Sequence, residues 1–182
     1  MSIRNIWDLR GACLLQIMGM GLFNVFEAVH MADAGLRPGM IGLLLALENA
    51  LFIVLSPLWG WIADRTGRYR RLIITGTVGC AFNLILFALA DSPSEFVLYA
   101  IVRGLFAPGI QSLMPTLAVA VVGKSRPGSG FGKYRAFGSI GFILGTGVLP
   151  LIFGDIATTC LVGSAFLAGS IGFIRRLPKV KA

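Results

Sequence analysis

Charged residues are scarce in this sequence. Asp, Glu, Lys and Arg together make up 13% of the 182 residues, whereas 56% of the residues are hydrophobic. Soluble domains contain about 25% charged residues, because charged side chains keep their surface in contact with water. The shortage of charge argues against a soluble domain and favours a helical bundle in lipid.

Cysteine and histidine are too few and too dispersed to indicate a metal site or a disulfide framework. Cys13, Cys80 and Cys160 each lie in an apolar segment without CxxC spacing, and His30 is the only histidine. A structural zinc site needs such ligands in a cluster. No motif brings together a nucleophile, a base and an orienting group. The sequence therefore predicts no metal, no cofactor and no enzymatic activity.

Acidic residues are outnumbered by basic ones, which leaves a net charge of +8. Clustered Lys and Arg can indicate nucleic-acid binding. Here the cations fall in short groups between long apolar runs, where their first role is to orient membrane helices. We therefore expect a lipid bilayer, and no nucleic acid, as the partner of these charges.

Six apolar segments are long enough to cross a membrane. A hydrocarbon core of about 30 Å needs about 20 residues of α-helix. The predicted fold is an all-α integral membrane protein with one domain over residues 1–182. The expected spans are residues 11–32, 39–63, 72–91, 95–122, 130–153 and 156–174.

The Lys and Arg residues also predict the orientation of the six spans. The loops on one side hold almost all of the cations, and the loops on the other side hold only Arg37. The positive-inside rule then places both termini in the cytoplasm, in a cytoplasmic (inner or plasma) membrane. The cations on the cytoplasmic side are Arg4, Arg10, Arg65, Arg68, Arg70, Arg71, Lys124, Arg126, Lys133, Arg135, Arg175, Arg176, Lys179 and Lys181.

The loop after the second expected span carries a specific motif. Residues 60–71 read GWIADRTGRYRR and resemble the signature loop between helices two and three of the major facilitator superfamily, roughly G-x-L-A-D-R-x-G-R-R. Asp64 would lie at the C-terminal end of a helix, where the macrodipole disfavours an anion, so we expect Arg65 and Arg68 to supply partners. The matching residues are Gly60, Ala63, Asp64, Arg65, Gly67 and Arg68.

A second stretch, FGKYRAFGSIGF at residues 131–142, resembles the start of helix five in one branch of this superfamily. That branch contains lactose permease and the nucleoside and phenylpropionate symporters. The resemblance implies that Arg135, which Ala136 and Phe137 separate from Gly138, binds substrate. It also implies that the chain matches the N-terminal six-helix half of a twelve-helix transporter.

The clear ionisable residues away from the ends of the expected spans are Glu27, Glu48 and Arg103, each of which costs about 2.5–3.5 kcal/mol and is a functional candidate. Glu48 and Arg103 lie at similar depths and can meet. They form either an internal ion pair that only fixes helix packing or part of a transport site. Glu27, without an obvious cation of its own, is the expected proton carrier. Asn24, Gln111 and Arg135 fall on polar stripes of the first, fourth and fifth spans.

Two classes of function remain open from the sequence. The first is half of a secondary transporter of the major facilitator type, which moves a small organic solute with protons by alternating access. The second is a non-transporting accessory or assembly subunit, or a fragment, that packs against other membrane proteins. In this family the substrate site lies between two halves. We therefore expect a parallel homodimer or a second six-helix chain, which would also provide a partner helix for Asp64.

Overall fold

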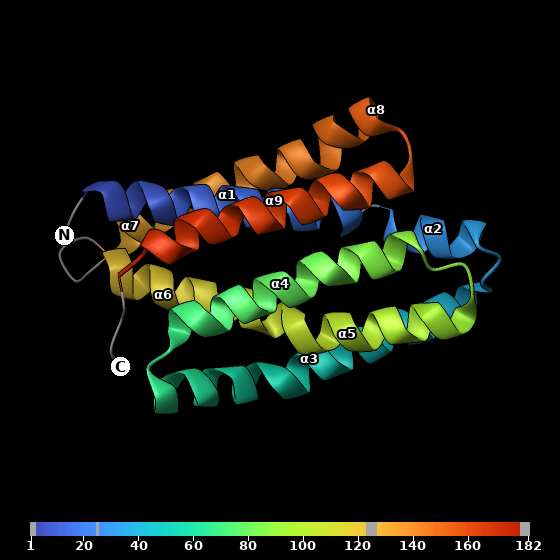
Figure 1. Cartoon of the computed structure of the whole chain (residues 1–182), viewed down its shortest axis with the longest axis horizontal. Coiled ribbons are helices and arrows are strands. Elements are labelled where there is room, and N and C mark those ends of the chain that lie inside the picture. The colour runs from blue at the N-terminus through green and yellow to red at the C-terminus, as the bar shows by residue number, and fades with distance from the viewer. Residues whose placement is uncertain (1–2, 25, 123–126, 179–182) are drawn as a thin grey trace.

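The computed structural model describes residues 3–24, 26–122 and 127–178, and in these residues the fold is entirely helical. The helices run side by side along the long axis of the molecule (Figure 1). They are α1 (Ile3–Asn24), α2 (Glu27–Asp33), α3 (Pro38–Thr66), α4 (Tyr69–Ala88), α5 (Pro93–Gln111), α6 (Leu113–Val122), α7 (Pro127–Ile143), the π-helix η1 (Leu144–Val148), α8 (Leu149–Phe153) and α9 (Ile156–Arg176).

Within the described residues, five helical segments are long and apolar enough to cross a membrane. The first expected span, 11–32, is not among them and divides into α1 and the short α2. Helix α1, which begins before this span, carries Asp8, Arg10 and Gln16, and these residues lower the hydropathy of the helix. The membrane span expected at residues 11–32, which would be the sixth in total, therefore stays a prediction, as does the orientation of the chain. The five segments are Pro38–Thr66, Tyr69–Ala88, Pro93–Val122, Gly128–Phe153 and Ile156–Arg176.

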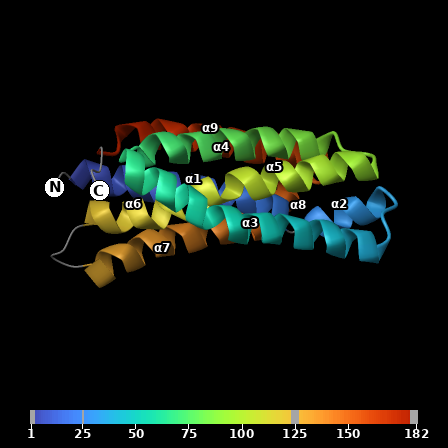
Figure 2. The ribbon, with the colours of Figure 1, turned by 90° about the horizontal axis from the view of Figure 1, so that it is seen from below.

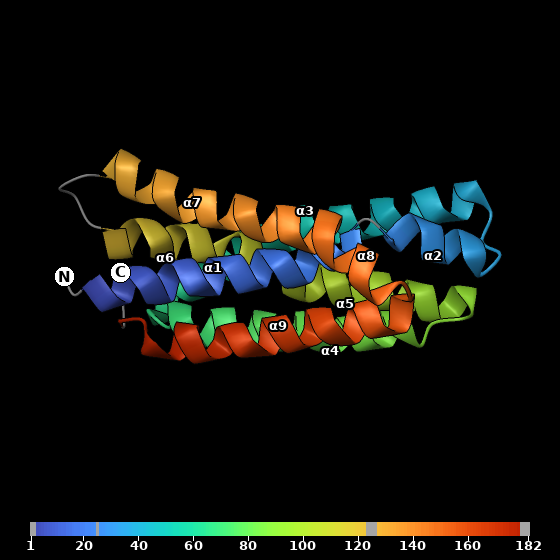
Figure 3. The same cartoon turned by 90° about the horizontal axis from the view of Figure 1, so that it is seen from above.

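Helix α1 is nevertheless central to the packing. Figure 3 shows it between α7 and α9. A Cβ atom added to Gly19 would lie 2.7 Å from the carbonyl oxygen of Gly163 in α9, and one added to Gly141 of α7 would lie 2.5 Å from the Leu14 carbonyl oxygen. Both distances are too short for a real Cβ atom. Glycine therefore permits the close backbone approach by which helices associate in lipid.

Proline divides the fourth expected span, 95–122, into α5 and α6. The break falls at Ser112. Pro115 has no N–H group for the carbonyl of Gln111, four residues earlier, and its ring crowds that carbonyl. Pro108 and Pro57, by contrast, lie inside α5 and α3, which stay continuous.

A second irregularity lies in the fifth expected span, 130–153, where the π-helix η1 separates α7 from α8. Pro150 removes the N–H group that an α-helix would direct to the carbonyl of Thr146. The Thr146 hydroxyl donates to the Phe142 carbonyl at 2.8 Å. The wider turn is thus explained by proline, and π-turns of this kind frequently accompany functional sites.

Helix α3 is the most exposed of the long helices. Figure 2 shows it crossing the view obliquely in front of the bundle. Only Leu44 and Ala63 of its 29 residues are buried. Large apolar side chains, including Leu43, Val54 and Trp61, point outward. This face requires lipid or another helix as its cover.

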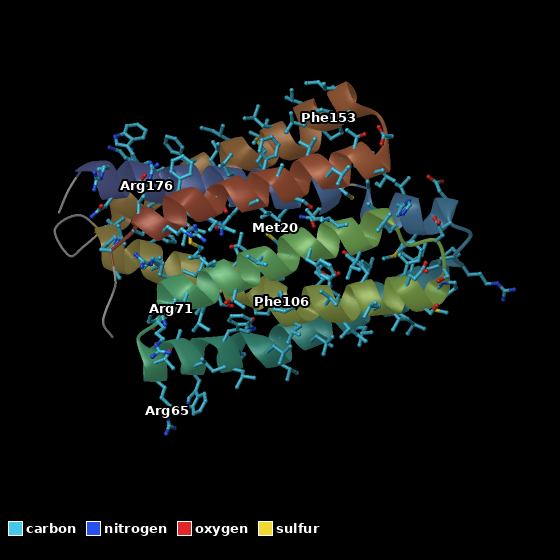
Figure 4. The ribbon with its side chains drawn as sticks, in the orientation of Figure 1. Met20, Arg65, Arg71, Phe106, Phe153 and Arg176 are labelled. Atoms are coloured by element: carbon cyan, nitrogen blue, oxygen red, sulfur yellow. The ribbon has the colours of Figure 1, made fainter. Side chains whose placement is uncertain are left out.

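The start of α1, the end of α9 and the turn between α3 and α4 lie at one end of the bundle (Figure 1). Figure 4 shows Arg65, Arg71 and Arg176 gathered there. Arg70 Nη1 donates to the carbonyls of Arg175 and Leu177, at 2.9 and 3.1 Å, and so closes the C-terminus of α9. Arg65, Arg70, Arg71 and Arg176 thus mark this end. Lys124, Arg126, Lys179 and Lys181 lie outside the described residues.

The opposite end contains the turn that enters α9. Asp155 is the N-cap residue of this helix and accepts a hydrogen bond of 2.7 Å from the Thr158 backbone N–H. This bond favours the ionised carboxylate and lowers the pKa of Asp155. A capped, polar turn is suited to the aqueous boundary of a membrane.

Candidate functional site

Arg103 of α5 is the centre of a buried charge cluster. Its Nε lies 2.7 Å from Glu48 Oε1 of α3, and its Nη1 lies 3.0 Å from Glu27 Oε2 of α2. Its Nη2 donates to Asn24 Oδ1 of α1 at 2.8 Å. One guanidinium offers five N–H donors, so it can bind all three groups at once. The cluster therefore connects four helices inside the bundle.

Tyr99 completes the cluster and was not among the sequence candidates. It lies one turn before Arg103 on α5 and is fully buried. Its hydroxyl donates to Glu27 Oε1 at 2.8 Å and accepts a bond of 2.7 Å from Arg103 Nη1. The spacing of four residues from Arg103, which places both on one helix face, was the signal that could have identified it.

The two carboxylates of the cluster differ in their hydrogen bonding. Both oxygens of Glu27 have partners, Tyr99 and Arg103. Glu48 Oε2 is buried and has no hydrogen-bond partner. The sequence correctly predicted that Glu48 and Arg103 can meet. Glu27 has no cation of its own, and it shares the Arg103 guanidinium with Glu48.

A pocket of about 240 Å³ adjoins this cluster, between α1, α7 and the junction of α5 and α6. Asn24, Gln111 and Arg135, the three remaining polar candidates, all line it. The break at Ser112 lies directly after Gln111. Much of the other lining is apolar, with Ile17, Met114 and Phe142 among the residues. Asn24 belongs to both the pocket and the charge cluster.

The signature loop lies at the far end of α3, away from the pocket. The Tyr69 hydroxyl donates to Asp64 Oδ1. The Arg65 guanidinium lies over the Trp61 ring, 5.2 Å from its centroid. The described residues contain no ion pair between Asp64 and either Arg65 or Arg68, so a role of these arginines as its partners stays a prediction. Arg65 is the next residue of α3 after Asp64, and adjacent residues on a helix do not face each other. Tyr69, the first residue of α4, supplies a hydroxyl instead.

The backbone conformation explains why one position of the signature loop is glycine. Gly67 ends α3 with a positive φ of 62°, and its N–H donates to the Ala63 carbonyl at 2.8 Å. Other residues adopt this left-handed conformation only at a cost. A Cβ atom at Gly60 would meet nothing within 4 Å, so that glycine faces open space. Gly67 is thus explained within this chain, whereas Gly60 is not.

Two further buried polar groups lie on α1, Gln16 and Asp8. Gln16 Nε2 donates to Thr77 Oγ1 of α4 at 3.0 Å, which joins the pocket wall to α4. Asp8 is buried near the start of α1, 3.9 Å from Arg176 Nη1. Asp8 precedes the first expected span, so hydropathy offered no reason to select it.

These observations define an integral membrane protein whose polar interior converges on a pocket between apolar helices. The family model of the Major Facilitator Superfamily matches residues 11–181. The chain belongs to this superfamily, whose members are membrane transporters and not enzymes.

Two curated proteins with sequences similar to this chain are named as a resistance protein and a transporter. Quinolone resistance protein NorA of Staphylococcus aureus (strain MRSA252) is 28% identical over 134 residues, 74% of this chain and 34% of NorA. Monocarboxylate transporter 13 of Rattus norvegicus is 26% identical over 176 residues, 93% of this chain and 41% of that protein. The chain thus spans less than half the length of these relatives. They do not single out the lactose permease branch, which stays a prediction.

Proposed function

We propose that this chain forms half of a secondary transporter that moves a small organic solute by alternating access. The position of Asn24 carries the proposal. Its Oδ1 accepts from Arg103, and the same side chain lines the pocket. A solute that binds Asn24 alters the bonding of the guanidinium that holds α2 and α3. Occupancy of the pocket is thereby linked to the packing of helices, as alternating access requires.

The test is to fill the pocket. Gly21 lines the pocket, and a Cβ atom there would lie 3.6 Å from Phe142 Cδ2, so we expect a phenylalanine at this position to reduce the space in the pocket. We expect Gly21→Phe to abolish uptake of labelled quinolone or monocarboxylate, the solute classes named by the relatives, into proteoliposomes. Gly172→Phe on α9 is the matched control, because a Cβ atom there meets nothing within 4 Å. Equal uptake by both variants would contradict a role for the pocket.

An unmodified chain that moves no solute, alone or with a second half, would instead support the accessory subunit. In that case Glu48 and Arg103 would serve only to fix the packing of α3 against α5. The uptake assay therefore separates the two classes of function.

The charge cluster supports proton coupling of this transport. Two carboxylates share one guanidinium, so one negative charge is in excess when both are ionised. An uncompensated charge in a bilayer interior is costly, and binding one proton removes it. The unpartnered Oε2 makes Glu48 the better acceptor. This revises the hypothesis that Glu27 carries the proton. The resemblance of residues 131–142 to symporters favours movement of solute and proton in one direction.

Orientation with the cationic end in the cytoplasm is a further part of the proposal. Cysteines introduced into residues 64–71 are expected to react with an impermeant maleimide only from the cytoplasmic side, and those in 92–94 only from outside. The native cysteines are buried and give little background. Reaction of both loops from the same side would show that the six-span topology is wrong.

We also propose that a second six-helix half, either another copy of this chain or a separate one, completes the site. Ser139 is exposed on α7, the helix that carries Arg135. Ser139→Cys is expected to crosslink to its partner in membranes, because polar helix faces cannot remain against lipid. Leu161→Cys, exposed on α9 on the other side of α1, is the control that should not crosslink. A strictly monomeric protein that still transports would refute this arrangement.

A further inference from the structure

We propose that an outer groove between α4 and α5 binds one acyl chain of an anionic phospholipid, with the headgroup phosphate of that lipid at Arg71. The groove and the pocket share no lining residue among those described, so the inference does not depend on transport. It rests on the shape of the groove, on the chemistry of its lining and on the position of one cation.

The groove is an open hollow of about 520 Å³ on the surface of the bundle. Val78 and Phe82 of α4 line it together with Val102 of α5. The Phe106 ring of α5 occupies the place that a side chain at Gly79 would take. Val78 and Phe82 are still 52% and 55% exposed, so the described part of the chain leaves the groove uncovered. In a membrane, either lipid or another protein must cover it.

The lining is almost wholly apolar. Thr75 has the only polar side chain of the described lining, and its hydroxyl donates to the Arg71 carbonyl at 3.1 Å. A hydrocarbon chain in the groove therefore gains dispersion contacts and leaves no charged group without a partner. Apolar contacts alone do not distinguish one phospholipid from another, so any selectivity must come from the end of the groove.

One cation lies in line with the groove. Arg71, Thr75, Val78 and Phe82 follow one another at intervals of four, three and four residues, which places them on one face of α4, and all four are exposed. Figure 4 shows Arg71 where α4 begins and Phe106 nearer the middle of the bundle. Long side chains on a helix lean towards its N-terminus, so we expect the guanidinium to reach the membrane boundary.

The length of this face matches one leaflet of a bilayer. From Arg71 to Phe82, α4 rises about 16 Å at about 1.5 Å per residue. Half of a hydrocarbon core of about 30 Å is about 15 Å. A lipid whose phosphate lies at Arg71 can thus extend its chain along the groove to the middle of the bilayer.

Charge favours an anionic headgroup at this position. The Arg71 guanidinium forms no ion pair with another described residue, so its donors are available to a phosphate. In a zwitterionic lipid the ammonium group offsets the phosphate, whereas an anionic lipid keeps its net negative charge. Cations beside a membrane span attract such lipids.

Two photoactivatable lipids test the proposal. Phosphatidylglycerol is anionic and phosphatidylcholine is zwitterionic, and both probes would carry the same diazirine-bearing acyl chain. The full chain would be illuminated in phosphatidylcholine nanodiscs that contain a trace of either probe, and mass spectrometry would identify the labelled residues. We expect the anionic probe to label Val78, Phe82 and Val102 about fivefold more, the ratio that corresponds to about 1 kcal/mol for one cation near the membrane surface.

Variants assign the headgroup preference and the groove separately. Arg71→Gln should make the two probes label the groove equally, whereas Arg65→Gln, which removes an exposed cation outside the groove lining, should keep the preference. Val78→Trp should fill the groove and lower the labelling of Val102 by both probes. Val54→Trp, at an exposed apolar position of α3, is its control. Size-exclusion profiles and helix content would verify that each variant is folded.

A preference for the anionic probe that Arg71→Gln removes and Arg65→Gln keeps would support the proposal. Equal labelling of the unmodified groove by both probes, or a preference that Arg71→Gln leaves unchanged, would overturn it. A groove that neither probe labels would also overturn it, and crosslinking of Val78→Cys between two chains would then identify a second copy as its cover.

Discussion

Replacing Arg103 by leucine is expected to lower the free energy of unfolding by about 3–5 kcal/mol, the cost of breaking a buried ion pair by removing one partner. The change leaves Glu27 and Glu48 without their counter-charge inside the bundle. It also removes the donors to Asn24 and Tyr99. Because these groups come from α1, α2, α3 and α5, the loss should loosen the whole bundle. Thermal unfolding of the reconstituted protein measures the effect.

Two further variants distinguish charge from shape at this position. Arg103→Lys keeps the positive charge, but an ammonium cannot reproduce the planar fork that binds three partners, so we expect intermediate stability. Combining Arg103→Leu with Glu27→Gln and Glu48→Gln should recover much of the loss, since no unpaired charge is left buried. An Arg103→Leu protein as stable as the parent would contradict the central role of the cluster.

Substituting Glu48 by glutamine is expected to abolish uptake driven by a pH gradient while leaving the protein folded. The amide keeps the size of the side chain and can still accept from Arg103, but it cannot bind a proton. Solute exchange without a gradient should persist, since the pocket is unchanged. Uptake into proteoliposomes, with and without an imposed pH gradient, measures both activities. A Glu48→Gln protein that keeps its gradient-driven uptake would exclude Glu48 as the proton site.

Glu27→Gln is the matched comparison, because it removes one carboxylate from the same cluster. Both oxygens of Glu27 accept hydrogen bonds, so its loss disturbs Tyr99 as well as Arg103. We expect a lower midpoint of thermal unfolding than for Glu48→Gln. Equal midpoints for the two variants would show that the carboxylates are equivalent and that the revised assignment is wrong.

Much of the bundle was predictable because it depends on local chemistry. Apolar length alone located the segments that became α3, α4 and α9, with ends a few residues from those expected. Counting residues along two helices was enough to bring Glu48 and Arg103 to one depth. Proline chemistry accounts for the break before Pro115, where α5 gives way to α6.

The details of the charge cluster were not predictable in this way. The expected continuous helix over 11–32 does not form as one element, and α2 brings Glu27 to Arg103. The neighbours that a residue of α2 meets depend on tertiary packing, which no local sequence pattern sets. Asn24 belongs to both the charge cluster and the pocket, and Asp8 is buried. Both facts likewise depend on which residues of other helices pack against α1.

The sequence by itself determined that this protein is a helical membrane protein and, through residues 60–71, its superfamily. Hydropathy and turn chemistry are properties of neighbouring residues, so they can be read along the chain. Only the tertiary structure decided that Arg103 binds both carboxylates, that Tyr69 and not an arginine serves Asp64, and that Arg135 faces a pocket without acidic residues among its described lining. These contacts depend on the distances between helices that are far apart in the chain, and those distances are set by backbone approach at residues such as Gly19 and Gly141.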